Sequence, residues 1–152
     1  MQTANRKSGY TLIELLVGLT IISIVFSIGF AGYRDFSRRQ TVVGVTKSII
    51  SDLRNAQQLA LIGQKPDTCT RLSGYTFTAV SSTNYTISAN CINGNIEVKN
   101  IVLPTNITIS LGSIMFKVLG QGTNLSAAYT FTITHISGIT GIINIKKGGT
   151  IN

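Results

Sequence analysis

One uncharged, strongly apolar run near the N-terminus constrains this chain more than any other feature. No charged residue occurs between Leu15 and Tyr33, and the run is rich in Leu, Ile, Val and Phe. A helix built from Tyr10 to Gly32, 23 residues, would be about 34 Å long. That length exceeds the hydrocarbon thickness of a bilayer, about 30 Å. The sequence therefore predicts a membrane-spanning helix.

A carboxylate, Glu14, lies at the start of this run, where burial in lipid costs several kcal/mol. The segment differs from a cleaved secretory signal, because its apolar part exceeds about 7–15 residues and no small-residue cleavage site closes it. Basic residues stand on both sides of the run, so charge counting does not fix its orientation. A carboxylate kept at that depth predicts a cationic partner.

The residues around Glu14 resemble the processing site of type IV prepilins. They read Arg-Lys-Ser-Gly-Tyr-Thr-Leu-Ile-Glu-Leu-Leu-Val from Arg6 to Val17. The resemblance implies a leader peptide over residues 1–9, which prepilin peptidase cuts between Gly9 and Tyr10 before the new Tyr10 amine is methylated. It also implies that Glu14 pairs with the amine of a neighbouring subunit and so serves assembly. The alternative is a plain signal anchor with an accidental glutamate.

Beyond a transmembrane helix over residues 10–33, the apolar pattern becomes amphipathic over residues 34–63. Gly63 is a suitable C-terminal cap and Pro66 follows soon after. We predict one nearly continuous helix from about Thr11 to Ile62, with Asp52 among the charged residues on its polar side. An apolar stripe would face a sheet or a partner helix in a filament. Its members are Phe36, Val43, Ile50, Leu53 and Ala60, with Ile49, Ala56 and Leu59 beside them.

The remainder, residues 64–152, reads as antiparallel strands. Apolar residues alternate with period two, a Ser-Ser-Thr-Asn turn predicts a hairpin, and Pro104 separates the third strand from the fourth. Seven or so short strands predict antiparallel sheets packed partly on each other. With the long helix they give an α+β fold, in which His135 is expected at the surface or at a strand end. The alternating sets are Tyr75/Phe77/Ala79, Tyr85/Ile87/Ala89, Ile96/Val98, Ile107/Ile109/Leu111, Ile114/Phe116/Val118, Tyr129/Phe131/Ile133 and Ile143/Ile145.

The two cysteines, Cys69 and Cys91, both lie beyond the apolar run. In an exported domain such a pair predicts one disulfide, which would stabilise the fold by roughly 3 kcal/mol; two buried free thiols are the alternative. No CxxC or His/Cys cluster occurs, so we predict no metal site. Catalytic motifs are also missing, and 5 acidic residues with 1 histidine offer few acid–base candidates. The sequence thus predicts neither an enzyme nor a cofactor.

The chain is basic, with 13 Lys and Arg against 5 Asp and Glu, or +8. Loss of Arg6 and Lys7 with the leader would leave +6. Such a surface could attract nucleic acid, anionic lipid headgroups or an acidic subunit, or be merely solvated, because its charges are scattered. Lys146 and Lys147 are the candidates for a polyanion contact, which two lysines would make weak and salt-sensitive.

A second, looser pattern extends over the rest of the chain. It resembles GspH/FimT-like minor pilins, which implies a minor pilin or pseudopilin of a type IV pilus or type II secretion filament. The chain would be anchored in the inner membrane with its C-terminal domain outside the cytoplasm, and its partners would be prepilin peptidase and other pilin subunits. The alternatives are a major pilin, or a pilus-tip DNA receptor in DNA uptake. The matching segments are Leu53-Arg54-Asn55-Ala56 with Ala60 and Cys69, Ile114-Met115-Phe116 with Gly120, and Lys147-Gly148-Gly149.

Overall fold

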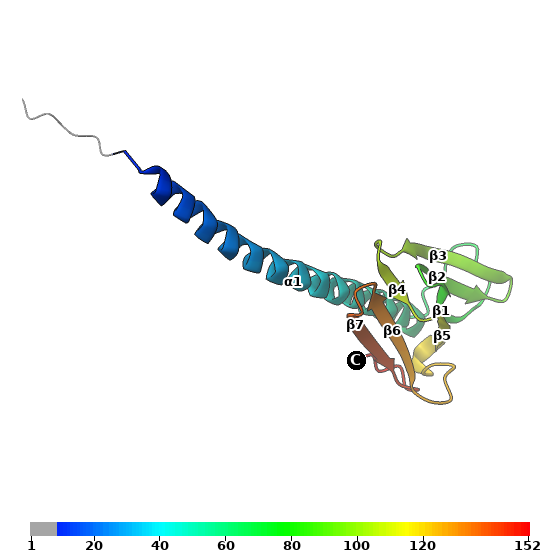
Figure 1. The fold of residues 1–152 in the computed structure, drawn as a ribbon. Helices are drawn as coiled ribbons and strands as arrows, with labels where there is room; N and C mark the ends of the chain where they lie inside the picture. The colour runs from blue at the N-terminus through cyan, green and yellow to red at the C-terminus, as the bar shows by residue number, and fades with distance from the viewer. Residues whose placement is uncertain (1–8) are drawn as a thin grey trace, which may run out of the picture. The chain divides into compact units, whose positions relative to one another are not determined.

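The structure, a computed structural model, describes residues 9–152, so the predicted leader lies outside the described residues except for Gly9. The fold is α+β, as predicted: one long helix and antiparallel strands (Figure 1). Within the described residues the elements are α1 (Leu12–Leu61), β1 (Leu72–Ser81), β2 (Asn84–Cys91), β3 (Gly94–Val102), β4 (Ile107–Ile109), β5 (Gly112–Lys117), a 3-10 turn (Val118–Gly120), β6 (Tyr129–His135) and β7 (Thr140–Ile145).

The chain forms two compact units that divide after Ser37. The anchor unit, residues 9–37, holds the first half of α1, which is long and apolar enough to span a membrane. Three hydroxyls in it, those of Thr20, Ser23 and Ser27, donate hydrogen bonds of 2.8 Å to carbonyls about one turn earlier in α1. Because lipid offers no hydrogen-bond partners, this internal pairing suits the segment to a bilayer.

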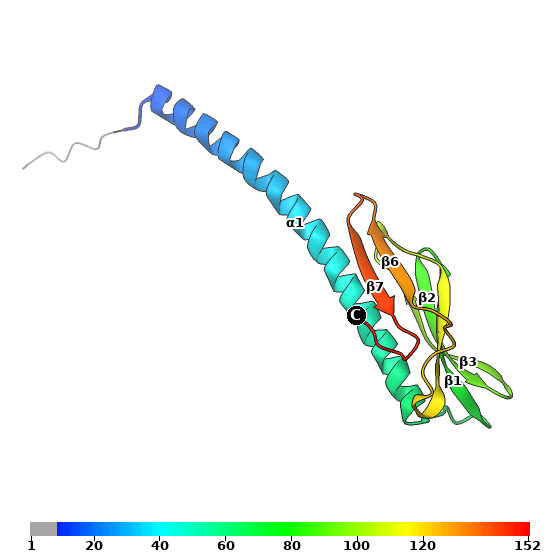
Figure 2. The same ribbon diagram turned by 90° about the horizontal axis from the view of Figure 1, so that it is seen from below.

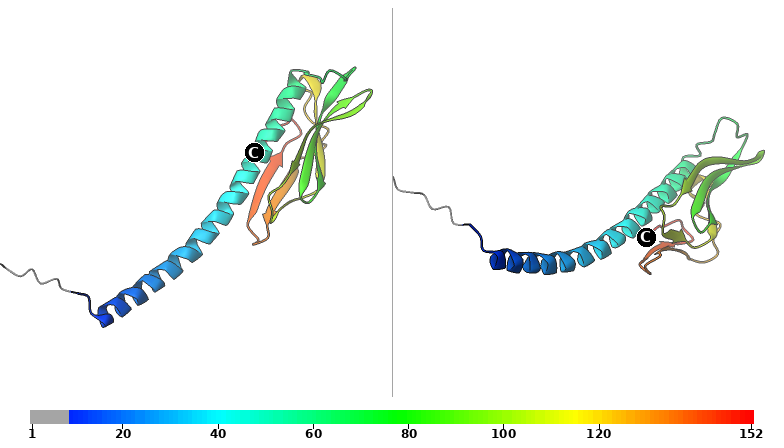
Figure 3. Two further views of the ribbon diagram at one scale, coloured as in Figure 1. Left: turned by 90° about the horizontal axis from the view of Figure 1, so that it is seen from above. Right: turned by 45° about the horizontal axis from the view of Figure 1, so that its top comes forward.

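The sheet unit, residues 38–152, contains all seven described strands in two antiparallel sheets. The strand orders are β3-β2-β1-β5 and β4-β6-β7. The second half of α1 lies along one side of the sheets, with β7 beside it (Figures 2 and 3). A Cβ at Gly141 of β7 would meet Val42 and Thr46 of α1, so the absent side chain is what allows this close approach.

Both sheets and α1 share one hydrophobic core. The ring of Phe77 in β1 lies 4.9 Å from that of Tyr85 and 5.2 Å from that of Phe131 in β6, between centroids, so the inner faces of the two sheets meet there. The predicted packing of sheet against sheet is therefore present. Helix α1 contributes five fully buried side chains, Val42, Ile49, Leu53, Ala56 and Ala60.

The phase of the predicted helix stripe was wrong at its N-terminal end. Val42 and Ile49 are buried, whereas Val43 and Phe36 are exposed, Phe36 by 59%. The buried residues Val42, Ile49 and Ala56 are themselves seven residues apart. The error is therefore one of phase, because the buried row lies one residue before the predicted one, about 100° around the helix.

Three strand assignments also need correction. Leu111 lies exposed between β4 and β5, and Val118 begins the 3-10 turn instead of extending β5. The third concerns Val98, which is 48% exposed and interrupts the alternation that begins at Ile96. It is the extra residue of a β-bulge, because Glu97 pairs with Ser88 and Lys99 with Ile87. A bulge reverses the alternation of faces beyond it.

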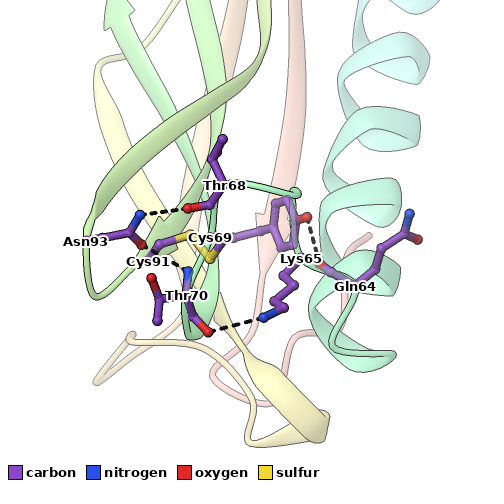
Figure 4. The surroundings of a disulfide bond; sticks show 8 residues. Gln64, Lys65, Thr68, Cys69, Thr70, Cys91 and Asn93 are labelled. Atoms are coloured by element: carbon purple, nitrogen blue, oxygen red, sulfur yellow. Dashed lines mark hydrogen bonds between the residues drawn. A yellow bond between two sulfur atoms is a disulfide. The ribbon is translucent and has the colours of Figure 1, made fainter.

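The predicted disulfide joins Cys69 to Cys91, with the two Cα atoms 5.6 Å apart (Figure 4). It ties the irregular segment after α1 to the end of β2. Asn93 strengthens the same junction, since its amide donates to the Thr68 carbonyl at 2.7 Å and its Oδ1 accepts from the Thr70 amide at 3.2 Å. The disulfide thus fixes the position of a segment that belongs to neither β-sheet.

Replacing both cysteines by serine should lower the free energy of unfolding by about 3 kcal/mol, because the unfolded chain regains the freedom of the closed loop. Denaturant unfolding of the full chain in detergent, followed by circular dichroism, measures the change. Wild-type protein under reducing conditions is the control and should unfold like the double variant. Equal stability of oxidised and reduced wild type would contradict a stabilising role.

Candidate functional site

The predicted cleavage point lies in non-helical backbone just before α1. Gly9 and Tyr10 are both exposed. Among the described residues, no heavy atom outside the neighbouring residues lies within 4 Å of the position a Cβ of Gly9 would take. The described part of the fold therefore gives no steric reason for glycine at position 9.

Thr11 caps the start of α1. The backbone amide of Glu14 donates to the Thr11 hydroxyl at 3.3 Å, as in one half of a capping box. The Thr-x-x-Glu spacing is a readable signal for this role, which was not among the predictions from the sequence. The cap uses only the amide of Glu14, so it leaves the carboxylate available.

The Glu14 carboxylate is exposed in the first turn of α1. The amide dipoles at a helix N-terminus favour a negative charge there. Within residues 9–152 the carboxylate forms neither a hydrogen bond nor an ion pair. If the first half of α1 lies in lipid, this group needs a cation from outside the described chain.

The apolar side chains on both sides of Glu14 are exposed along the first half of α1. An apolar surface of this extent is unfavourable in water, so lipid or neighbouring helices must cover it. The exposed set contains Leu12, Ile13, Leu15, Leu16, Val17, Leu19, Ile21, Ile22, Ile24, Val25, Phe26, Ile28, Phe30 and Tyr33.

A polar cluster inside the sheet unit joins α1 to the four-stranded sheet. The Tyr85 hydroxyl donates to Asp52 Oδ2 at 2.7 Å, and Lys99 Nζ lies 2.6 Å from Asp52 Oδ1. Asp52 is buried, so its predicted place on the polar side of the helix was wrong. Lys99 reaches it because the bulge at Val98 turns position 99 toward the helix.

This cluster is suited to fastening the helix and not to acid–base chemistry. Burial raises the pKa of Tyr85, and the hydrogen bond and negative charge of Asp52 raise it further. A hydroxyl held protonated at neutral pH is a poor base and nucleophile. Asp52 has both oxygens engaged, so it stabilises the packing of α1 on β2 and β3.

His135 was predicted at the surface or at a strand end. It lies at the end of β6, but its side chain is buried, with 9% exposure. Its Nδ1 accepts a hydrogen bond from the Ser137 amide at 3.0 Å and lies 2.7 Å from the Ser137 hydroxyl. The ring therefore shapes the β6–β7 turn. Among the described residues, no group of three His, Cys, Asp or Glu side chains gathers as a metal site would require.

Lys146 and Lys147 follow β7 in a tight turn and are exposed. The amide of Gly149 donates to the Lys146 carbonyl at 2.8 Å, and the Lys147 carbonyl accepts from the Thr123 amide at 3.0 Å. The backbone of the pair is thus fixed while both ammonium groups face solvent. A polyanion contact at these lysines stays a prediction.

Comparison with known proteins adds one finding, at the N-terminus. Residues 4–30 match the family model described as the prokaryotic N-terminal methylation motif. The match includes Gly9, Tyr10 and Glu14. No curated protein and no solved structure matches the chain. The resemblance to GspH/FimT-like minor pilins therefore stays a prediction, and the N-terminal segment is the candidate functional site.

Proposed function

We propose that this chain, which carries the type IV prepilin signature, is a minor pilin or pseudopilin. Prepilin peptidase would process it, and it would then enter a type IV pilus or a type II secretion filament. One observation carries the proposal: the methylation motif coincides with an unpartnered carboxylate, Glu14, at the start of an apolar helix. The domain that follows would be held outside the cytoplasm, where its disulfide is stable.

Membrane electrostatics supply the assembly mechanism. Cleavage after Gly9 would leave a cationic amine on Tyr10, close to the start of the apolar run. A lone amine and a lone carboxylate are each costly in lipid, whereas a pair largely offsets that cost. Glu14 would therefore favour positions in which it meets the Tyr10 amine of a neighbouring subunit. Such pairing sets the axial position of one helix against the next.

The charge of the sheet unit supports a minor subunit over a major one. Residues 38–152 hold ten Lys and Arg but only three acidic residues, Asp52, Asp67 and Glu97. Asp52 is already bonded to Lys99. A filament built only of this chain would set like-charged surfaces against each other, which disfavours association. A few copies among less basic subunits would avoid that repulsion, so low abundance in sheared filaments is the expected behaviour.

Replacing Glu14 by alanine should leave leader removal intact but reduce incorporation into filaments. Loss of one partner from a pair buried in lipid costs roughly 3–5 kcal/mol, so we expect a decrease of at least about tenfold. Immunoblots of sheared filaments and of membranes measure incorporation and processing separately. Glu97→Ala removes another exposed glutamate, in β3, and is the control. Wild-type incorporation of the Glu14 variant would refute the assembly role.

A further inference from the structure

One end of the sheet unit combines exposed apolar side chains with basic ones. We call it the hairpin-tip surface, and it consists of Arg39, Val43 and Lys47 of α1 with Ile136 and Ile139 of the β6–β7 turn. Arg39, Val43, Lys47 and Ile139 line a groove of about 380 Å³ between the helix and the start of β7. Ile136 belongs to the same turn, which a hydrogen bond of 2.8 Å from the His135 amide to the Ile139 carbonyl closes. The turn can be followed beside α1 in Figure 2.

Two apolar side chains of this surface, Ile136 and Val43, lie outside the described core, whereas Ile139 packs partly against it. Ile136 is 80% exposed at the tip of the turn, and Val43 on the neighbouring helix is also exposed. The turn itself needs only Gly138, whose φ of 86° suits glycine, and Ser137, which bonds to His135. An isoleucine projecting from a turn beside a groove marks a contact surface.

The charges of this surface are all positive. Arg39 and Lys47 form neither ion pairs nor hydrogen bonds within the part of the chain that the structure describes. The three carboxylates of the unit do not line the groove. Asp52 is bonded to Lys99, Asp67 lies in the segment after α1, and Glu97 lies in β3. Basic residues flanking exposed apolar ones are typical of surfaces that bind anionic membranes.

We propose that the hairpin-tip surface docks on the anionic surface of the bilayer that holds the anchor unit, before the subunit enters a filament. This inference rests on the proposed membrane insertion. The uncharged run ends at Tyr33, and the six residues from there to Arg39 can reach at most about 20 Å. A tethered domain meets that surface at a high effective concentration.

The spacing of the two cations favours a lipid surface over a protein partner. Arg39 and Lys47 are eight residues apart on α1, or about 12 Å. A field of headgroups supplies anions at both positions at once, while Ile136 enters the interface beneath them. A second copy of this chain would bring cations against cations. The bilayer therefore offers anions to Arg39 and Lys47 and an apolar environment to Ile136.

The chain contains no tryptophan, so a single introduced one reports on its own surroundings. The full chain would be reconstituted in vesicles of phosphatidylglycerol and phosphatidylcholine whose acyl chains are brominated and quench nearby indole fluorescence. Three variants form the set: Ile136→Trp in the β6–β7 turn, Ile92→Trp in the β2–β3 turn, and Phe26→Trp in the span. Ile92 is a matched control, because it is 68% exposed in the turn between β2 and β3, beside the disulfide.

Brominated lipid should quench Ile136→Trp and Phe26→Trp but not Ile92→Trp. Adding Arg39→Gln and Lys47→Gln to Ile136→Trp should lower the ratio of docked to undocked domain by roughly 30-fold, since each cation near an anionic surface contributes about fivefold. Replacing the mixed vesicles by vesicles of phosphatidylcholine alone should lower the ratio of docked to undocked domain by a similar factor.

The outcomes separate this inference from the function it rests on. Quenching of Phe26→Trp without quenching of Ile136→Trp would refute docking of the hairpin-tip surface but agree with membrane insertion of the anchor unit. No quenching of Phe26→Trp would overturn both. If Ile136→Trp were shielded from iodide in water yet not quenched by lipid, a contact with a second copy would replace the proposal.

Discussion

We expect leucine in place of Gly9 to leave the leader on the chain and to keep the protein out of filaments. The backbone at a scissile bond has to enter a narrow protease site, and a side chain at position 9 would displace it. A displacement of about 1 Å can slow a reaction by about 100-fold. Mass spectrometry of the N-terminal peptide measures the uncleaved fraction directly.

Two features make this substitution a clean test of recognition. Among the described residues no heavy atom stands within 4 Å of a Cβ at Gly9, so the variant has no steric reason to misfold. Gly29 in α1 has the same open surroundings. Gly29→Leu is therefore the matched control and should be processed normally. Normal trimming of Gly9→Leu would refute cleavage between Gly9 and Tyr10.

The largest loss of stability is expected from Phe77→Ala. Phe77 is fully buried where the two sheets meet, with its ring against those of Tyr85 and Phe131. Truncating a buried phenylalanine lowers the free energy of unfolding by about 3–5 kcal/mol, because packing is lost and a cavity remains. Whole domains are stable by only about 5–15 kcal/mol, so this loss would be severe. Denaturant unfolding of the full chain in detergent measures it.

Phe36→Ala provides the comparison, since it removes the same side chain from an exposed position on α1. Its effect on unfolding should stay within about 0.5 kcal/mol. Equal losses for the two variants would mean that the sheets do not pack through Phe77. Leader removal should be unchanged in both, because Phe77 lies in the other unit and Phe36 lies well beyond Glu14 along α1.

The elements of the fold were readable from the sequence because their signals are local. The predicted helix from Thr11 to Ile62 differs from α1 by one residue at each end. Strand faces such as Tyr75, Phe77 and Ala79 follow from strict alternation. The errors arise where two neighbouring rows of a helix are both apolar, as Val42 and Val43 are in α1, or where one extra residue interrupts the alternation of a strand, as at Val98.

The N-terminal methylation motif was readable for the same reason: its residues are neighbours in the chain. The bond between Lys99 and Asp52 was not, because it joins β3 to α1 and depends on the bulge. The hairpin-tip surface was hidden too, since Arg39 and Ile139 line one groove only after β7 packs beside the helix. Contacts between distant segments carry no local period that a sequence pattern can reveal.

The bulge in β3 has one more consequence. β3 is the outer strand of its sheet, and an outer strand with a regular ladder can recruit strands from other chains and start aggregation. The extra residue at Val98 interrupts the row of free amides and carbonyls, and charged Glu97 and Lys99 stand on either side of it. A subunit that waits at a crowded membrane among similar proteins needs such protection. The bulge that brings Lys99 to Asp52 thus also hinders other chains from pairing with the exposed edge of the sheet.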